Sequence, residues 1–319
     1  MDIKYSYLPL IGSEIALSLY PQLIKLVPTT IETQVAVRCI TYSILAIIGY
    51  YISSSYSDSD KKIKSLPFMN YLSIGLCMGI VNIIHIISSY MCFNILSSGV
   101  SYSIFYIYPI FNLIGRTLFY NENIEIINYI YIIIAIIGVY LIYKKEYIEN
   151  SIQTTTDTTT PDTTTPDTTT YTFMSIFNTK NKNIGIISGI VSALSESLIY
   201  FMVKGDTNNI SPYIQLLKTY LLGGILSIIY LIQNVKYIDL DYHYWITLIL
   251  FNTIIGFVGY LVRFMMISHL STLLFNSLIF ISVIFSYFWG YLLNNESIHI
   301  NNIAGTLLIL WSIFQINKK

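Results

Sequence analysis

The sequence predicts an all-α membrane protein with ten transmembrane helices, arranged as two inverted repeats of five helices. Three observations lead to this fold class: an apolar composition, long apolar runs along the chain, and a second half that matches the first. Of the 319 residues, 54% are hydrophobic and 11% are charged, whereas a soluble protein has roughly a quarter charged residues. The composition is therefore that of a chain that lies in a bilayer.

Apolar runs of about the 20 residues needed to cross a bilayer follow one another almost end to end. Two of them, "IYIIIAII" and "IIGVYLIY", are apolar on every face, which favours helices over the alternating strands of a membrane barrel. The ten predicted spans are residues 7–27, 35–53, 71–94, 100–118, 126–143, 184–203, 214–232, 245–266, 270–293 and 298–316.

A polar segment separates the fifth span from the sixth. It contains "TTTPDTTTPDTTT", which has too little apolar surface to form a packed core and therefore reads as a flexible spacer. The predicted organisation is a first five-helix repeat at 1–148, a Thr/Pro-rich linker at 149–182 and a second five-helix repeat at 183–319.

The two halves match at three separate places. "PIFNLIGRTLFYNENI" from Pro109 aligns with "VIFSYFWGYLLNNESI" from Val283, and the pairs Asn121/Asn295 and Glu122/Glu296 are identical. "SLYPQLIK" similarly aligns with "SLIYFMVK", and Arg38 aligns with Lys218. Because five is an odd number, the second copy must enter the membrane from the opposite face, as in many secondary transporters.

This pattern resembles the drug/metabolite transporter superfamily, in particular its EamA-like members. The resemblance rests on Pro109 with Glu122 thirteen positions later, on the second helix pair that ends in Glu296, and on the segments "SYMCFNILSSGVSYSIFYIYP" and "RFMMISHLSTLLFNSLIFISV". It implies transport and cytosolic termini. Val283 stands where the family has its second proline, so a kink, expected at Pro109, is expected in one repeat only.

Charged side chains inside the predicted spans are the candidate site, because each costs about 2.5 kcal/mol or more at the bilayer centre unless it is paired or hydrated. A cavity lined by such groups would suit a zwitterionic or anionic metabolite, and the glutamates could carry protons for coupling. The candidates for substrate binding or coupling are Glu14, Arg38, His85, Glu196, Lys218 and Arg263.

Structural roles compete with these assignments. Glu14 could pair with a basic residue to lock helices, and His85 could be an interhelical hydrogen-bonding group. Glu296, at a helix end, could be a solvated charge, and Lys25 and Lys204 could extend to the membrane interface. A minority of the tyrosines could stack on a planar ligand, with these candidates: Tyr20, Tyr106, Tyr108, Tyr200 and Tyr260.

The leading functional prediction is a secondary transporter that moves a small polar metabolite by alternating access. The alternatives are a nucleotide-sugar transporter of the Golgi or endoplasmic reticulum, and a non-transporting membrane scaffold with the same fold. We find no motif of an enzyme, and we expect no metal or cofactor. The formal net charge of zero leaves no basic footprint for nucleic acid.

The expected partners are a small-molecule substrate and the lipid bilayer. Two GxxxG motifs, Gly75/Gly79 and Gly185/Gly189, permit close helix packing within one chain or in a homodimer. The cluster "KKIK" favours cytosolic termini. The identity of the host membrane does not follow from the sequence.

Overall fold

The computed structural model describes residues 7–56, 68–120, 125–156, 181–205, 211–234, 241–270 and 272–317. Several features predicted from sequence lie outside these ranges: Glu122, the "KKIK" cluster, both chain ends and most of the linker. The described residues form helices and contain no β-strand.

The helices follow one another from α1 to α14, with one π-helical turn, η6. Their bounds are α1 (Tyr7–Leu17), α2 (Tyr20–Leu26), α3 (Ile31–Tyr56), α4 (Phe68–Ile95), α5 (Ser98–Phe105), α6 (Tyr108–Tyr120), α7 (Ile126–Thr156), α8 (Lys182–Gly205), α9 (Pro212–Asn234), α10 (Tyr242–Phe251), η6 (Asn252–Phe257), α11 (Val258–His269), α12 (Thr272–Ile279), α13 (Ile281–Asn294) and α14 (Ile300–Asn317).

Seven helical segments of the described chain are long and apolar enough to cross a membrane. The first and fourth predicted spans are each divided into two short helices, and the tenth, α14, is apolar but shorter. The chain is therefore an all-helical, multi-pass integral membrane protein.

The two divided spans break in front of a proline. α2 begins at Tyr20 with Pro21 as its second residue, and α6 begins at Tyr108 with Pro109 as its second residue. Proline has no N–H to donate, so it is tolerated in the first turn of a helix and disrupts a helix interior. The interruption expected from Pro109 lies directly before it, at residues 106–107.

The second repeat is also interrupted, which differs from the expected kink in one repeat only. α12 ends at Ile279 and α13 begins at Ile281, although Val283 replaces the proline. A tight turn forms in both copies: the Val283 N–H donates to the Phe280 carbonyl at 3.1 Å, and the Ile110 N–H donates to the Ile107 carbonyl at 2.9 Å. The break therefore depends on this turn and its surroundings, and proline is not required for it.

The segment from α10 to α11 contains the π-helical turn. A π-turn inserts one extra residue into a helix and is frequent at functional sites. Here it begins with Asn252, whose Oδ1 accepts a hydrogen bond from the Tyr20 hydroxyl at 3.0 Å. Gly256 lies against the hydroxyls of Tyr20 and Tyr42, where a side chain would collide. The turn thus joins the second half to α2 and α3 of the first half.

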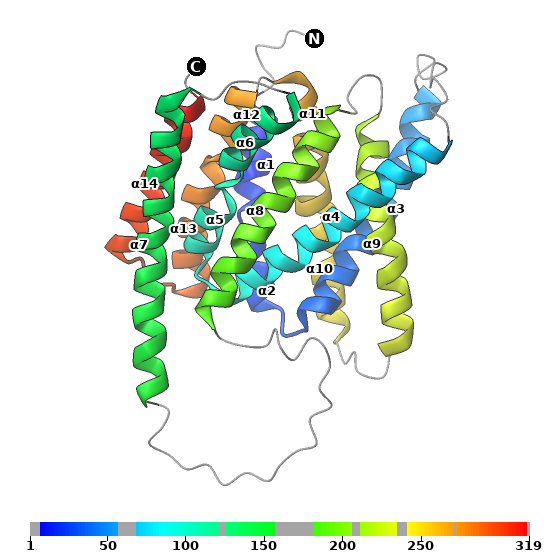
Figure 1. The fold of residues 1–319 in the computed structure, drawn as a ribbon. Helices are drawn as coiled ribbons and strands as arrows, with labels where there is room; N and C mark the ends of the chain where they lie inside the picture. Colours follow the sequence, from blue (N-terminus) through cyan, green and yellow to red (C-terminus); the bar gives the residue numbers. More distant parts are fainter. Residues whose placement is uncertain are drawn as a thin grey trace.

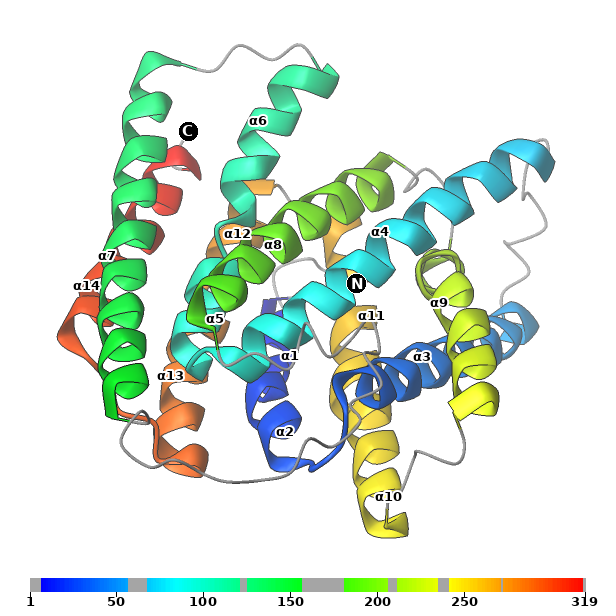
Figure 2. The ribbon, with the colours of Figure 1, turned by 60° about the horizontal axis from the view of Figure 1, so that its bottom comes forward.

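Helices of the two halves pack against each other, and the pairs α3–α9 and α7–α14 occupy corresponding places in the two predicted repeats. α3 packs on α9, α7 packs on α14, and α4 packs on α8. Figure 1 shows the members of the pairs α3–α9 and α7–α14 running in opposite directions. In Figure 2, α7 and α14 lie together at one edge of the bundle, while α4 and α8 cross its middle.

The interior combines a hydrophobic core with many buried polar side chains, and large hydrophobic side chains are exposed on the outer surface. Buried polar side chains include Glu14, Arg38, His85 and Arg263, whereas α7 exposes a row of isoleucines that includes Ile133 and Ile137. Lipid accepts the apolar face, and polar groups inside a membrane protein face the bundle interior.

The predicted linker begins later than expected. α7 continues to Thr156, so residues 149–156 of the predicted linker 149–182 are helical. Residues 149–156 contain no proline and are therefore compatible with a helix, which the composition of the linker did not indicate.

The GxxxG glycines mostly serve packing within the chain. A Cβ atom at Gly79 would meet Leu222, one at Gly185 would meet Leu96, and one at Gly189 would meet Ile104, each within 3.0 Å. Gly75 has open space around it. Three of the four glycines are therefore used by neighbouring helices of the same chain.

We predict that Gly138→Ala destabilises the protein, whereas Gly75→Ala does not. A Cβ atom at Gly138 of α7 would lie 2.6 Å from the backbone carbonyl oxygen of Gly305 on α14, and backbone cannot move aside as a side chain can. Overpacking of this kind costs about 1–3 kcal/mol. Thermal unfolding in detergent should show a lower Tm for Gly138→Ala and an unchanged or raised Tm for the control, because alanine favours helix.

Candidate functional site: a charged cluster between the two halves

Glu14 of α1 lies at the centre of the bundle and is fully buried. Its Oε2 atom accepts hydrogen bonds from the Tyr106 hydroxyl at 2.7 Å, from the Ser282 hydroxyl at 2.6 Å and from Arg263 Nη2 at 2.6 Å. Its Oε1 atom pairs with Arg263 Nε. The carboxylate therefore forms a bidentate ion pair with arginine, which is among the strongest hydrogen-bonding arrangements in proteins.

The interrupted helices provide two of these partners. Tyr106 lies in the break between α5 and α6, and Ser282 is the second residue of α13, directly after the break in the second half. α1 packs against both α11 and α13. The two breaks therefore place side chains of both halves around one carboxylate.

Arg263 of α11 extends the cluster to a second carboxylate. Its Nη1 atom lies 3.4 Å from Glu196 Oε1 on α8, and Glu196 Oε2 lies 3.5 Å from His85 Nε2 on α4. The other ring nitrogen of His85, Nδ1, lies 3.3 Å from the Ser192 carbonyl oxygen and hydroxyl. A continuous chain of polar contacts thus joins Glu14, Arg263, Glu196 and His85.

The two glutamates differ in how many of their carboxylate oxygens have hydrogen-bond partners. All the contacts of Glu14 are short, and its side chain is excluded from solvent. Glu196 retains 12% of its side-chain exposure, and its Oε2 atom has no hydrogen-bond partner within the part of the chain that the structure describes. Glu14 is therefore the fixed partner of Arg263, and Glu196 has acceptor capacity left over.

Arg38 of α3 is a buried cation surrounded by tyrosines. Its Nη2 atom donates to the Tyr220 hydroxyl at 3.0 Å, and its Nε atom has no hydrogen-bond partner among the described residues. No described carboxylate forms an ion pair with it. The guanidinium carbon lies within 6 Å of five ring centres, close enough for cation–π attraction; these belong to Tyr20, Tyr42, Tyr90, Tyr220 and Tyr260.

A small internal cavity connects Arg38 with the charged cluster. Its lining includes Arg38, His85 and Arg263, together with Tyr20 and Tyr260. Its volume of about 10 Å³ is room for roughly one water molecule. The central space is thus too small for an organic metabolite in this conformation.

The remaining sequence candidates lie at the edge of this site or outside it. Lys218 of α9 is buried, but it is not among the residues that line the central cavity. Of the tyrosines singled out from the sequence, Tyr20, Tyr106 and Tyr260 belong to the site, whereas Tyr200 contacts Lys204 through its ring and hydroxyl.

The sequence did not single out Ser282, Tyr42, Tyr90 or Tyr220 as members of the site. Tyr42 follows Arg38 by four residues on α3 and so shares its helix face, a signal that the sequence contains. Tyr220 and Ser282 reach the site from other helices, and only the packing reveals them.

A second ion pair closes one end of the bundle. Lys25 Nζ of α2 lies 2.5 Å from Glu296 Oε1, and it also donates to the Leu96 carbonyl at 2.8 Å. Glu296 accepts from the Ser98 N–H at 2.7 Å, at the first turn of α5. Asn295, in the left-handed conformation with φ 51°, ends α13 and turns Glu296 toward these partners. Glu296 is thus a bridging group between halves, which differs from the solvated charge considered above.

The larger pocket of the structure lies elsewhere. It has a volume of about 400 Å³ and is bounded by α3, α4, α9 and the connection between α2 and α3. Cys39 lines it, whereas the neighbouring residue Arg38 lines the central cavity, so α3 separates the two spaces. Among the described residues, no group of three or more His, Cys, Asp or Glu side chains could hold a metal ion.

Comparison with known proteins identifies related sequences and folds. The model of the EamA-like transporter family matches residues 4–144 and 183–318. A solved structure described as "Crystal structure of protein" is similar to the chain with a TM-score of 0.60 and 9% sequence identity, over 98% of this chain and 96% of its own. At that identity the likeness shows the fold alone. The comparison with curated proteins found no match.

We predict strong coupling between Glu14 and Arg263. Either Glu14→Gln or Arg263→Gln leaves a buried charge without its partner and should lower the free energy of unfolding by about 3–5 kcal/mol. The double variant should lose less than the sum of the two, because contacting residues couple by about 0.5–3 kcal/mol.

Denaturant titrations of the four proteins in mixed micelles measure this coupling. Asp241→Asn, at an exposed position before α10, keeps a side chain able to cap that helix, so it is the control and should change stability little. Additive losses in the double variant would contradict the ion pair as the link between α1 and α11.

Proposed function

The chain belongs to the EamA-like transporter family, and from this premise we propose that it is a secondary transporter that moves a small polar metabolite by alternating access. The proposal includes two five-helix repeats at 1–148 and 183–319, with ten spans in total. Seven segments have the required length and apolarity, and α1 with α2, α5 with α6, and α14 would be the other three. The opposite directions of α3 and α9 and of α7 and α14 support an inverted arrangement (Figure 1).

Arg38 is the observation that carries the proposed substrate class. A buried cation without a described carboxylate partner is costly in a membrane interior, because tyrosine rings and hydroxyls compensate a charge only partly. An anionic group of the substrate would supply the missing counter-charge. We therefore propose a zwitterionic or anionic metabolite whose acidic group binds Arg38 next to the cavity shared with Arg263.

Glu196 and His85 are the proposed coupling pair. Glu196 Oε2 faces His85 Nε2 at 3.5 Å and has no hydrogen-bond partner in the described chain, so it can accept a proton or an amino group of the substrate. Glu14 is less suited to this role, because Arg263, Tyr106 and Ser282 already occupy its oxygens. Lys218 stays a candidate on the neighbouring helix α9.

The ion pair between Lys25 and Glu296 supports alternating access. It links α2 of the first half to the residue that follows α13 of the second half, at the end of the bundle opposite the start of α1 (Figure 1). With this end held together and the central cavity nearly filled, the conformation matches a closed state of the cycle. Transport would require this pair to separate and re-form.

Two other functions compete with this proposal. A nucleotide-sugar transporter of the same fold would need the central space to open much further than the present cavity of about 10 Å³. A non-transporting scaffold would have no ligand at Arg38. Cytosolic termini and a homodimer are further proposals, for which the sequence patterns described above are the support.

We predict that an acidic metabolite stabilises the protein and that Arg38→Gln abolishes this effect. The measurement is thermal unfolding in detergent against amino acids, nucleotides, nucleotide sugars, phosphorylated sugars and amines. A ligand at 100 times its Kd should stabilise by roughly 2.7 kcal/mol. Arg38→Lys keeps the charge and loses the planar guanidinium group, so this variant should bind the acidic metabolite more weakly than the wild type.

Each outcome of the panel has a defined meaning. A nucleotide-sugar hit that depends on Arg38 would favour the nucleotide-sugar alternative. Stabilisation that persists in Arg38→Gln would contradict the proposed anion site, and a folded protein that responds to no compound would favour the scaffold.

We also predict that Glu296→Gln opens the end of the bundle closed by Lys25. Losing a hydrogen bond to a charged group should shift the equilibrium between the closed and the open form of this end by about ten-fold or more. Cys92, buried near the end of α4, is a native reporter. In a Cys39→Ser, Cys77→Ser background, a water-soluble maleimide should label Cys92 about ten-fold faster in Glu296→Gln. Glu125→Gln is the matched control, and equal rates would contradict a closing role.

A further inference from the structure

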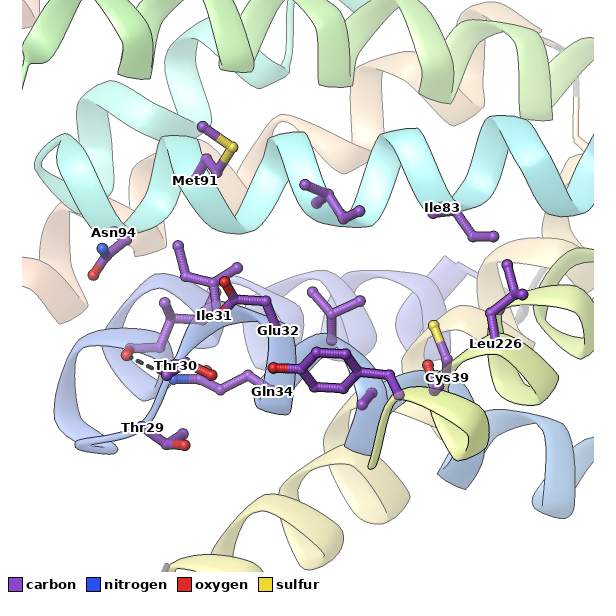
Figure 3. Close-up of a pocket in the computed structure, with 17 residues that line it drawn as sticks. Thr29, Thr30, Ile31, Glu32, Gln34, Cys39, Ile83, Met91, Asn94 and Leu226 are labelled. Atoms are coloured by element: carbon purple, nitrogen blue, oxygen red, sulfur yellow. Dashed lines mark hydrogen bonds between the residues drawn. The ribbon is translucent and has the colours of Figure 1, made fainter. Parts of the chain in front are cut away.

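The pocket beside α3 has the size and shape of a small-molecule site. Its volume of about 400 Å³ is within the range of about 300–1,000 Å³ that is usual for ligand pockets. Figure 3 shows the lining side chains around one space, with α4 on one side and α3 on the other. Leu226 and Tyr230 of α9 complete the wall, so both halves of the protein contribute.

The walls of the pocket are mainly apolar. Side chains of α3 and α4 form most of this surface, and Gly223 of α9 leaves room where a side chain would approach Cys39. The apolar wall residues include Ile24, Val35, Ile83, Ile87, Met91 and Leu226. Such a lining binds the hydrocarbon part of a molecule through burial of apolar area.

One end of the pocket is polar and carries a single charged residue. Thr29, Thr30 and Glu32 lie at the connection between α2 and α3, with Asn94 at the end of α4 (Figure 3). Glu32 is half-buried, and no described residue forms an ion pair with it. The charge of the lining is therefore negative.

Gln34 also forms part of the pocket wall. It is almost fully buried, and its Nε2 atom donates to the carbonyl oxygens of Ile24 at 3.1 Å and Val27 at 3.4 Å. These bonds fix the orientation of the amide, and Oε1 has no hydrogen-bond partner among the described residues. Oε1 is itself buried, so Gln34 shapes the wall and leaves Glu32 as the charged group available to a ligand.

We propose that this pocket binds an amphiphilic amine: a molecule with an ammonium group at Glu32 and an apolar body against α3, α4 and α9. An ammonium group is a cation with up to three N–H donors and no acceptor, so it matches a carboxylate that has no described cationic partner. An anionic or neutral amphiphile lacks either the charge or the donors. This inference concerns a separate space and does not depend on the substrate proposed for the central site.

A molecule bound in this pocket would affect the movement of the two halves relative to each other. The pocket lies between α3 and α4 of the first half and α9 of the second, and α3 carries Arg38 on its other side. Relative movement of the halves would change the shape of the pocket. A bound amine would therefore favour one conformation of the protein and act on transport from outside the central site.

The test uses the full-length protein in nanodiscs of phosphatidylcholine and tritiated octylamine as the probe. Saturable binding should be displaced at least about ten-fold better by unlabelled octylamine than by octanol or octanoate, since a hydrogen bond to a charged group contributes about that factor. Equal competition by all three would overturn the proposal, and this arm needs no variant.

Variants locate the site. Glu32→Gln should weaken octylamine binding about ten-fold, and Leu226→Trp, which fills the pocket, should remove it. Asp241→Asn changes an exposed charge before α10, keeps a side chain able to cap that helix, and should bind octylamine as the wild type does. Unchanged binding in both pocket variants would overturn the proposal.

The composition of the bilayer distinguishes two possible sources of a natural amine: the headgroup of a membrane lipid and a free amphiphilic amine. If nanodiscs that contain phosphatidylethanolamine lose octylamine binding, the headgroup of a membrane lipid occupies the pocket. If binding persists, the site takes a free amphiphilic amine. Both results support an ammonium site, and they differ only in its source.

Discussion

The ion pair between Glu14 and Arg263 is the interaction on which the rest of the interior depends. It joins α1 of the first half to α11 of the second, and it is excluded from solvent. A lone charge at this depth would be very costly, so each residue requires the other. Tyr106 and Ser282 satisfy the remaining acceptor capacity of Glu14, and both come from places where a helix is interrupted. The breaks in the helices and the buried charge are thus parts of one arrangement.

The charged side chains of the interior differ in how completely their partners neutralise them, and the proposed function rests on this difference. Glu14 is fully paired, Glu196 has an unused oxygen, and Arg38 has aromatic rings and one hydroxyl in place of a carboxylate. A purely structural network would gain stability from complete pairing. Incomplete pairing at Arg38 and Glu196 fits the proposed transport cycle, in which such groups would exchange partners.

The two internal spaces differ in the chemistry that they present. The central cavity is small, lies among arginines and tyrosines, and suits an anionic group. The pocket beside α3 is larger, mainly apolar, and negative at its polar end. Only one helix separates them, and neighbouring residues of that helix, Arg38 and Cys39, face one space each. In the proposed mechanism, the substrate and a second ligand would lie on opposite sides of α3.

The sequence by itself determined the membrane class, the helices and the family. Apolar runs predict helices because a bilayer leaves no other way to satisfy the backbone, and charges within such runs identify interior positions. This reasoning selected Glu14, His85, Glu196 and Arg263, which the structure brings into one chain of contacts. A repeat with an odd number of helices likewise predicted opposite directions for the two halves, consistent with the paired helices (Figure 1).

Only the tertiary structure decided which charges meet and which stay unpaired. Glu296 looked like a solvated helix end, and it binds Lys25 and the first turn of α5 from a distant part of the chain. The helix break at Phe280 occurs without a proline, so the sequence did not indicate it. The tyrosines around Arg38 come from five helices: α2, α3, α4, α9 and α11. Helical periodicity identifies the face of one helix, but the neighbour of that face depends on packing between segments far apart in sequence. The partners of a buried charge are therefore a property of the fold, while the presence of the charge is a property of the sequence.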